Sequence, residues 1–399
     1  MKRIDFENGN IVSNILKAAL PMLVAQIMSL LYNIVDRVYI ARIPDVGTTA
    51  LGAVGLCFPI IVIITAFSNL FGTGGAPIFA IERGKGNHEK AGLLMNTSFT
   101  LLTLCAVILM IIGLLFARPI LVLFGASDAG LAYAYPYLMI YLLGTFPSMA
   151  ATGMNPFINA QGYATTGMTS VIIGAVANLL LDPLFIFVFG LGIKGAAIAT
   201  IISQTLSAAF VLYFLHYKAE YRIRFLSKTE LASCGEDAKN IVSLGTAGFI
   251  MQLTNSLVTI CANNVLSVTG GDVYISVMTI ISSVRQMVET SRFTPSQKVP
   301  RRSSATITVP GAPQKIRQAG ITMAVLALIY TLLIWSVILA APRFLIGIFQ
   351  LGSGPDDRYR PRHETLFCCI YLHAAAICGS NNFQSPQQEE ICHLFLHTA

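Results

Sequence analysis

The sequence predicts an all-α polytopic membrane protein, and three observations carry that prediction. Hydrophobic residues make up 55% of the chain and charged residues only 11%, against about 25% charged in soluble domains. A transmembrane β-barrel would alternate apolar and polar residues over roughly ten-residue strands, and no such alternation is present. Several segments carry no charge and are long enough to span a bilayer, which takes about 20 apolar residues: 51–80, 96–117, 129–181, 195–217, 240–271 and 318–341.

The charge pattern of the first half predicts both its helices and their orientation. Basic loops follow the second helix, at 82–90, and the sixth, at 218–228, on the same side as Lys2 and Arg3. Because Lys and Arg are enriched in cytoplasmic loops, we expect the N-terminus and both loops in the cytoplasm. The net charge of +7 then reflects topology, not nucleic-acid binding. The six predicted helices are 14–43, 52–80, 92–117, 130–154, 163–190 and 194–216.

A second bundle is predicted after the 218–228 loop, because the pattern of the first bundle restarts. Residues 19–38 can be laid over residues 245–264, which places Gln26 opposite Gln252. Two related bundles with a substrate site between them are a common transporter design. We therefore expect a second helical bundle related to the first.

The chain changes character twice after residue 290. Residues 291–312 hold several basic residues and three prolines, and residues 350–399 hold four of the six histidines and four of the eight cysteines. Both blocks can be back-translated so that a one-base shift encodes membrane-protein sequence. We hypothesise that the reading frame is disrupted twice, which resequencing of the gene would test. The predicted organisation is a first lobe at 1–216, a cytoplasmic linker at 217–238, a partial second lobe at 239–349 and an aberrant tail at 350–399.

One acid stands inside an almost wholly apolar helix. The charge-free run before Asp182 begins at Ala129, and the next charge after it is Lys194. A carboxylate at the centre of a membrane-spanning helix costs at least ~2.5–3.5 kcal/mol, so it is retained where it faces a partner or a water-filled path. Asn178, one turn earlier, shares its helix face, and Pro183 weakens the helix beside it. This arrangement predicts ion or proton handling, and hence transport.

Several motifs together resemble the MATE (multidrug and toxic compound extrusion) family of transporters: Leu20–Pro21, Tyr32–Asp36, Gly74–Gly75, Asn159–Gly162, Asn178–Pro183 and Gly192–Ala197. The resemblance covers about 9–290 and resumes at 314–349. It implies two six-helix lobes, the second of them incomplete, with about ten of the twelve helices present in this chain. It also implies a secondary active antiporter that exports cationic or amphipathic drugs in exchange for Na⁺ or H⁺. It also implies a monomer in a bacterial inner membrane, with no cofactor besides the coupling ion.

Matched motif by motif, the resemblance implies a cation site in the first lobe. The site falls on Asp36, Asn178 and Asp182, with Tyr137 and Thr200 as nearby hydrogen-bonding positions. If the coupling ion is Na⁺, the first three residues are its ligands; the sequence leaves Na⁺ and H⁺ open. Plainer interpretations remain for each residue. Asp36 next to Arg37 could be a boundary ion pair, and Tyr137 and Thr200 could be packing residues.

Three other functions compete with drug efflux. A lipid or polysaccharide flippase of the same superfamily would be expected to have a cationic cavity instead of an acidic one. A membrane-embedded enzyme would need a catalytic or metal-binding cluster, but the chain before residue 291 has only His88 and His216, both in or beside loops. We therefore do not expect an enzyme. A nonfunctional product of a frameshifted transporter gene is the third alternative.

Overall fold

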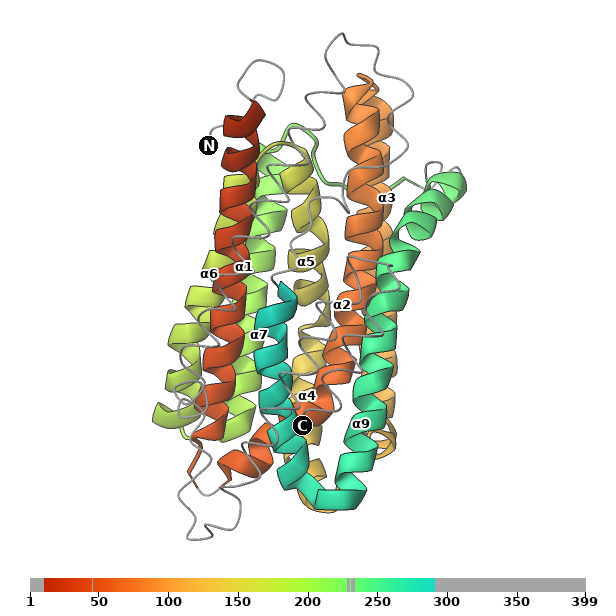
Figure 1. Ribbon diagram of the computed structural model, residues 1–399. Coiled ribbons are helices and arrows are strands. Elements are labelled where there is room, and N and C mark those ends of the chain that lie inside the picture. Colours follow the sequence, from red (N-terminus) through yellow and green to blue (C-terminus); the bar gives the residue numbers. More distant parts are fainter. Residues whose placement is uncertain (1–10, 45, 228–229, 231–233, 291–399) are drawn as a thin grey trace, which may run out of the picture.

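The computed structural model describes residues 11–44, 46–227, 230 and 234–290, and every regular element in these residues is a helix. The helices stand side by side as an elongated bundle (Figure 1). Residues 291–312, the end of the second lobe and the tail at 350–399, for which the sequence makes separate predictions, lie outside the described residues. The long elements are α1 (Ile11–Ala41), α2 (Gly47–Gly84), α3 (His88–Leu123), α4 (Asp128–Leu143), α5 (Thr145–Ala160), α6 (Ala164–Pro183), α7 (Gly192–Tyr213) and α9 (Gly235–Thr290).

The predicted all-helical membrane fold is confirmed, with one correction in the fourth helix. The sequence predicts a continuous helix at 130–154, but the chain breaks at Gly144 into α4 and α5. Glycine is a poor helix former, and the Thr145 hydroxyl donates to the Leu142 carbonyl oxygen at 2.7 Å, next to the break. A second correction concerns Asn159, which was expected in a loop and lies in the last turn of α5.

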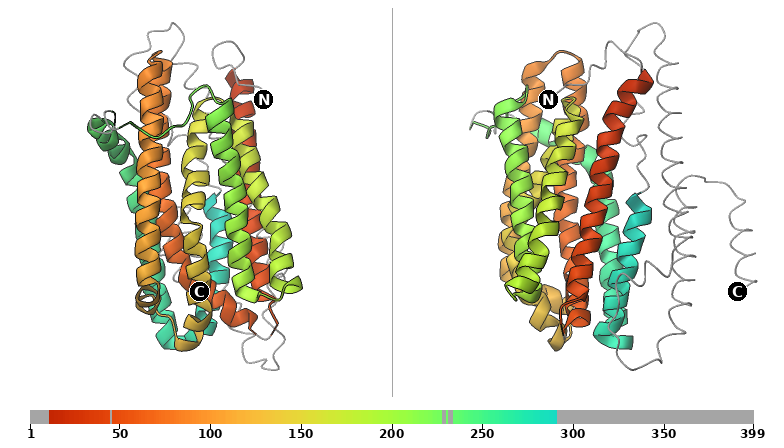
Figure 2. Two further views of the ribbon diagram at one scale, coloured as in Figure 1. Left: turned by 180° about the vertical axis from the view of Figure 1, so that it is seen from behind. Right: turned by 90° about the vertical axis from the view of Figure 1, so that its left-hand side faces the viewer.

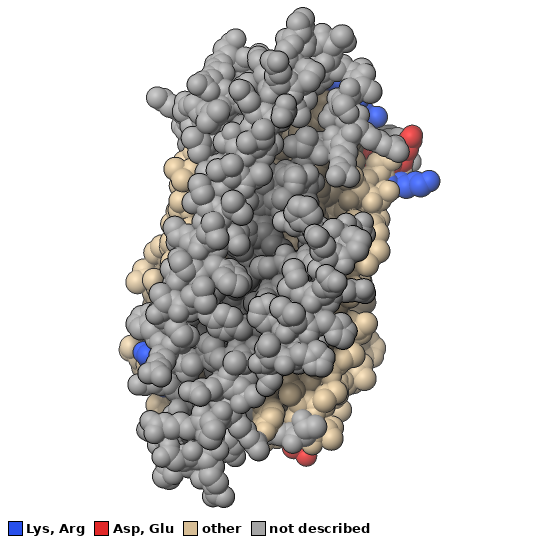
Figure 3. Space-filling view, in the orientation of Figure 1, with Lys and Arg blue, Asp and Glu red and all other residues tan. Residues whose placement is uncertain are grey.

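Six helices in the described part of the chain are long and apolar enough to cross a membrane: Leu20–Ala41, Gly47–Gly84, His88–Leu123, Ala164–Val188, Gly192–Lys218 and Gly235–Val268. The helices α4 and α5 have 16 residues each and follow one another with only Gly144 between them. Large apolar side chains face outward, as on α3, where Leu104 and Leu115 are exposed. The charged side chains visible in Figure 3 lie toward the two ends of the molecule. The protein is therefore an integral membrane protein.

The two basic loops lie at the same end of the bundle, at the top in Figure 1. Arg83, at the end of α2, forms an ion pair with Glu220 after α7, at 3.7 Å. His88 Nδ1, at the start of α3, lies 2.6 Å from the Tyr221 hydroxyl. The shared end agrees with the predicted topology; the side of the membrane on which it lies stays a prediction.

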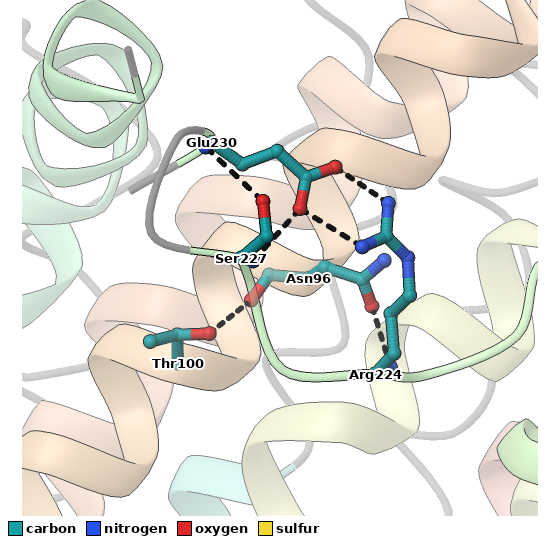
Figure 4. A network of polar contacts seen from close by, with 5 residues as sticks. All are labelled: Asn96, Thr100, Arg224, Ser227 and Glu230. Carbon is teal, nitrogen blue, oxygen red and sulfur yellow. Dashed lines mark hydrogen bonds and ion pairs between the residues drawn. The ribbon is translucent and has the colours of Figure 1, made fainter. Parts of the chain in front are cut away.

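The segment after α7 is fastened to the first bundle before α9 begins. A π-helical turn, η2 (Phe214–Lys218), ends α7, and the following chain buries alternate residues, Ala219, Tyr221 and Ile223. The Arg224 backbone N–H then donates to Asn96 Oδ1 of α3 at 3.0 Å. Figure 4 shows this contact beside the pair formed by Arg224 and Glu230. The linker is thus ordered against the helices that precede it.

The helix α9 runs the length of α2 and turns back at Gly271, which has φ +64°. Small residues allow close approach: a Cβ on Gly245 would lie 2.1 Å from the Leu70 carbonyl oxygen, and a Cβ on Gly74 would lie 2.3 Å from that of Ile241. Farther along, Pro59 lacks an N–H and so leaves the Gly55 carbonyl of α2 without its helical donor. Asn263 Nδ2 of α9 lies 3.4 Å from that carbonyl oxygen, so α9 supplies the missing donor.

Candidate cation site and adjoining cavity

Asp182 is held inside the bundle near the end of α6. Its side chain is fully buried, and Asn178, one turn earlier, donates from Nδ2 to Asp182 Oδ1 at 2.9 Å. Pro183 closes the α-helix, and a π-helical turn, η1 (Leu184–Val188), follows. The i, i+4 spacing that the sequence suggested therefore produces a direct hydrogen bond between the two side chains.

Asp36 of α1 faces Asp182 of α6. The two carboxyl groups lie close enough to interact electrostatically, which brings the two acids of the sequence prediction into one place. Figure 2 shows α1 lying between α6 and the arms of α9. Asp36 Oδ1 and Asp182 Oδ2 are buried and have no hydrogen-bond partner among the residues that the structure describes. Because buried polar atoms normally have partners, these two oxygens mark a place for a proton or a cation.

Tyr137 and Thr200 occupy different positions relative to the acids. Tyr137, on α4, is 3% exposed, stacks on Tyr141, and lies within electrostatic range of both carboxyl groups. The Thr200 hydroxyl donates to the Ala196 carbonyl oxygen at 2.9 Å, within its own helix. Thr200 also borders the cavity described below. The structure thus places Tyr137 beside the acids and Thr200 on the cavity wall.

A cavity of about 330 Å³ adjoins this cluster, and Asn178 is part of both. Its wall comes from α1, α2, α5, α6 and α7, and none of the described residues that line it is charged. Hydrogen bonds between side chains hold the part of the wall formed by α5 and α6. Asn159 Nδ2 donates to Asn155 Oδ1 at 2.9 Å, and Asn155 Nδ2 donates to Ser170 Oγ at 2.8 Å. The polar residues of the wall are Gln26, Ser29, Tyr32, Asn69, Thr73, Thr152, Asn155, Asn159, Asn178, Thr200, Ser203, Gln204 and Ser207.

Most of these lining residues were missed by the sequence interpretation, although a signal for them exists. Thr200, Ser203, Gln204 and Ser207 follow the i, i+3, i+4, i+7 spacing of one helix face. A polar stripe with that spacing on an apolar membrane helix must face a partner or an aqueous space, because lipid offers no hydrogen bonds. The same test, applied to Gln26 and Ser29 on α1, would have found the opposite wall.

The donor set suits a proton or a hard cation. Carboxylate and amide oxygens are the ligands that such cations favour, and Asp36, Asn178 and Asp182 supply them from two adjacent helices. The boundary ion-pair interpretation of Asp36 is incomplete, because Asp36 lies within α1 and faces Asp182 as well as its neighbour Arg37, while Arg42 is exposed beyond the helix end. The functional role of the cluster stays a prediction.

Comparison with known proteins points to one family. The MatE family model matches residues 21–184. The multidrug export protein MepA of Staphylococcus haemolyticus is 25% identical over 268 residues, which are 66% of this chain and 58% of that protein. The probable multidrug resistance protein YpnP of Bacillus subtilis is 26% identical over 217 residues, 54% of this chain and 48% of that protein. The chain thus spans about half the length of these relatives.

A solved structure agrees in fold. The MATE multidrug transporter DinF-BH is 25% identical, with a TM-score of 0.73 over 94% of this chain and 84% of that one. The region matched by the family model includes Asp36, Asn178 and Asp182. Over that region the chain is similar to the MATE family of transporters, and its described fold is similar to that of a MATE multidrug transporter.

Proposed function

We propose that this protein is a secondary active multidrug efflux antiporter of the inner membrane that exports cationic or amphipathic drugs in exchange for Na⁺ or H⁺. The observation that carries the proposal is the buried pair of Asp36 and Asp182, with Asn178 joining it to the cavity. The multidrug export proteins among its relatives support the choice of substrate class.

The coupling follows from electrostatics. Two carboxylates that face each other in a low-dielectric interior repel, and a proton or Na⁺ between them relieves the repulsion. A drug that binds the cation-free state better is released when the cation binds, because the linkage is reciprocal. The packing of α1 against α6 transmits the change, since each helix contributes one of the acids.

The cavity suits a drug that hydrogen-bonds and stacks. Its volume is at the lower end of small-molecule sites, and amide and hydroxyl groups line it together with Met22, Met168 and Tyr32. Flexible methionines adapt to ligands of different shape. A cationic ligand would gain further from the two nearby carboxylates when no coupling cation occupies them.

A lipid or polysaccharide flippase is the less favoured alternative. It would need basic residues to hold phosphate or acidic sugar groups, and the described lining residues include none.

The test is ethidium efflux from vesicles that contain the full chain, with Na⁺ and H⁺ gradients imposed separately. We expect one gradient to drive efflux and Asp182→Asn to abolish it while expression and insertion stay normal. Insertion should persist because the substitution removes a charge that is costly in the bilayer. Efflux that ignores both gradients would exclude antiport, and a wild-type rate in Asp182→Asn would exclude the site.

A further inference from the structure

A third charged side chain lies at the acid pair. Arg37 follows Asp36 in α1 and is only 5% exposed. Its guanidinium carbon lies 5.1 Å from the centre of the Phe58 ring of α2, in the position of a cation–π contact. Arg37 therefore extends into the bundle between α1 and α2. A guanidinium at a helix boundary would instead extend into water.

The environment of Arg37 is that of the acid cluster. A buried charge is costly unless opposite charges and hydrogen bonds offset it. The electrostatic neighbours of the guanidinium are Asp36 first, then Tyr137 and Tyr32. Asp36 in turn faces Asp182. Among the residues that the structure describes, Arg37 thus lies within electrostatic range of Asp36, and Asp36 within range of Asp182, so that one cation and two acids form one cluster.

We propose that Arg37 is the fixed counter-charge of the coupling site and sets the charge that the site binds. With both acids ionised, two carboxylates and one guanidinium leave a single net negative charge, which one Na⁺ or one proton neutralises. A divalent cation would leave the site positive. The proposal rests on the coupling function proposed above and adds its valence: one monovalent cation in each cycle.

A purely structural role for Arg37 predicts a different effect of its replacement on ion binding. If Arg37 only anchors α1 to Phe58, its replacement would change stability without changing which ions bind. If Arg37 is a counter-charge, Arg37→Gln leaves two net negative charges, and a divalent cation becomes the matching ligand. Ca²⁺ suits such a site, since it takes carboxylate and amide oxygens together with water.

The experiment measures the thermal midpoint of the purified full chain in detergent at alkaline pH against NaCl and CaCl₂, with choline chloride holding ionic strength constant. For Arg37→Gln we expect Ca²⁺ to raise the midpoint at concentrations at least about tenfold lower than for the wild type, since removing one positive charge from a buried, weakly screened cluster changes ion binding by at least that much. Arg37→Lys keeps the charge and should behave like the wild type.

Arg42→Gln is the matched control, because it makes the same chemical change at the exposed end of α1. It should leave the Ca²⁺ response at the wild-type level. Adding Asp182→Asn to Arg37→Gln restores one net negative charge and should remove the gained Ca²⁺ response. Repulsion between the two acids could make Arg37→Gln poorly expressed. In that case Arg37→Gln/Asp182→Asn should recover expression. The control Arg37→Gln/Thr205→Ala, which changes an exposed hydroxyl of α7, should not.

The outcomes separate the two proposals. A Ca²⁺ response of Arg37→Gln equal to that of Arg42→Gln would overturn the counter-charge, and so would expression that Asp182→Asn fails to recover. Neither result would affect the coupling role of Asp182, which the efflux experiment tests. Ethidium efflux that is normal in Asp182→Asn would remove the coupling site, and a Ca²⁺ gain in Arg37→Gln would still show that the charges of the cluster are balanced by Arg37.

Discussion

Alanine substitutions at Gly245 and Gly248 of α9 can be compared to measure how tightly α9 packs on α2. A Cβ on Gly245 would lie 2.1 Å from the carbonyl oxygen and 2.9 Å from the carbonyl carbon of Leu70. These are backbone atoms, which cannot rotate away. A Cβ on Gly248, one turn along the same helix, would meet none of the residues that the structure describes within 4 Å. The two glycines thus differ in packing and share their helical setting.

The expected magnitudes follow from that difference. Replacing a helical glycine by alanine stabilises by roughly 0.5–1 kcal/mol, and both variants gain this equally. Overpacking a close contact costs about 1–3 kcal/mol, and only Gly245→Ala meets that cost. The free energy of unfolding should therefore be about 1–3 kcal/mol lower for Gly245→Ala than for Gly248→Ala, because the helical contribution cancels.

The assay is denaturant unfolding of the purified full chain in mixed micelles, with the free energies compared at one detergent composition. Gly74→Ala should behave like Gly245→Ala, because its Cβ would lie 2.3 Å from the Ile241 carbonyl oxygen. Equal stability of the Gly245 and Gly248 variants would refute the reasoning, since it would mean that α2 and α9 are not in backbone contact.

Three further predictions concern the topology, the acid cluster and the linker. Cysteine at Asn87, in the loop at the linker end, should resist external impermeant thiol reagents, and cysteine at Ala129, exposed at the opposite end, should react; the reverse pattern would invert the topology. If Na⁺ is the coupling ion, Asn178→Ala removes an amide oxygen of the site and the hydrogen bond that holds the Asp182 carboxylate, at about 1–3 kcal/mol, so the Na⁺ concentration for half-maximal efflux should rise by about fivefold or more, and an unchanged value would contradict the role of Asn178. Arg224 and then Ser227 hydrogen-bond Glu230 and lower its pKa to about 2. Because a depressed pKa adds stability above the unfolded value and loses it as pH falls through the folded value, the protection of the 219–227 amides relative to their intrinsic exchange rates should hold as the pH falls to about 4.5 and decrease below it. Glu230→Gln should show the lower protection already at neutral pH, and unchanged protection there would contradict the role of this pair.

The sequence could predict the helices because a bilayer demands long apolar segments, and the charge-free runs mark them. It could not predict the break at Gly144, because the uncharged run from 129 to 181 holds no charged residue to show where one helix ends. One glycine inside an apolar helix costs too little to signal a break by itself.

For the site, helical spacing could predict that Asn178 and Asp182 share a face, but not that Asp36 faces them. That pairing depends on how α1 packs on α6 and entered the prediction through family resemblance. The sequence around Arg37 is compatible with an ion pair with Asp36 at the end of a membrane helix. The burial of Arg37 over Phe58 depends on α2, which the sequence of α1 alone cannot supply.

The central claim is that cation binding at Asp36, Asn178 and Asp182 is coupled to drug movement. The most direct measurement is cation flux into proteoliposomes of the full chain, followed with ²²Na⁺ and with a pH-sensitive dye, on addition of ethidium to the side from which it is exported. We expect ethidium to accelerate the flux of one cation in the wild type and to have no effect in Asp182→Asn. Ethidium-stimulated flux of the same size in Asp182→Asn would contradict the claim.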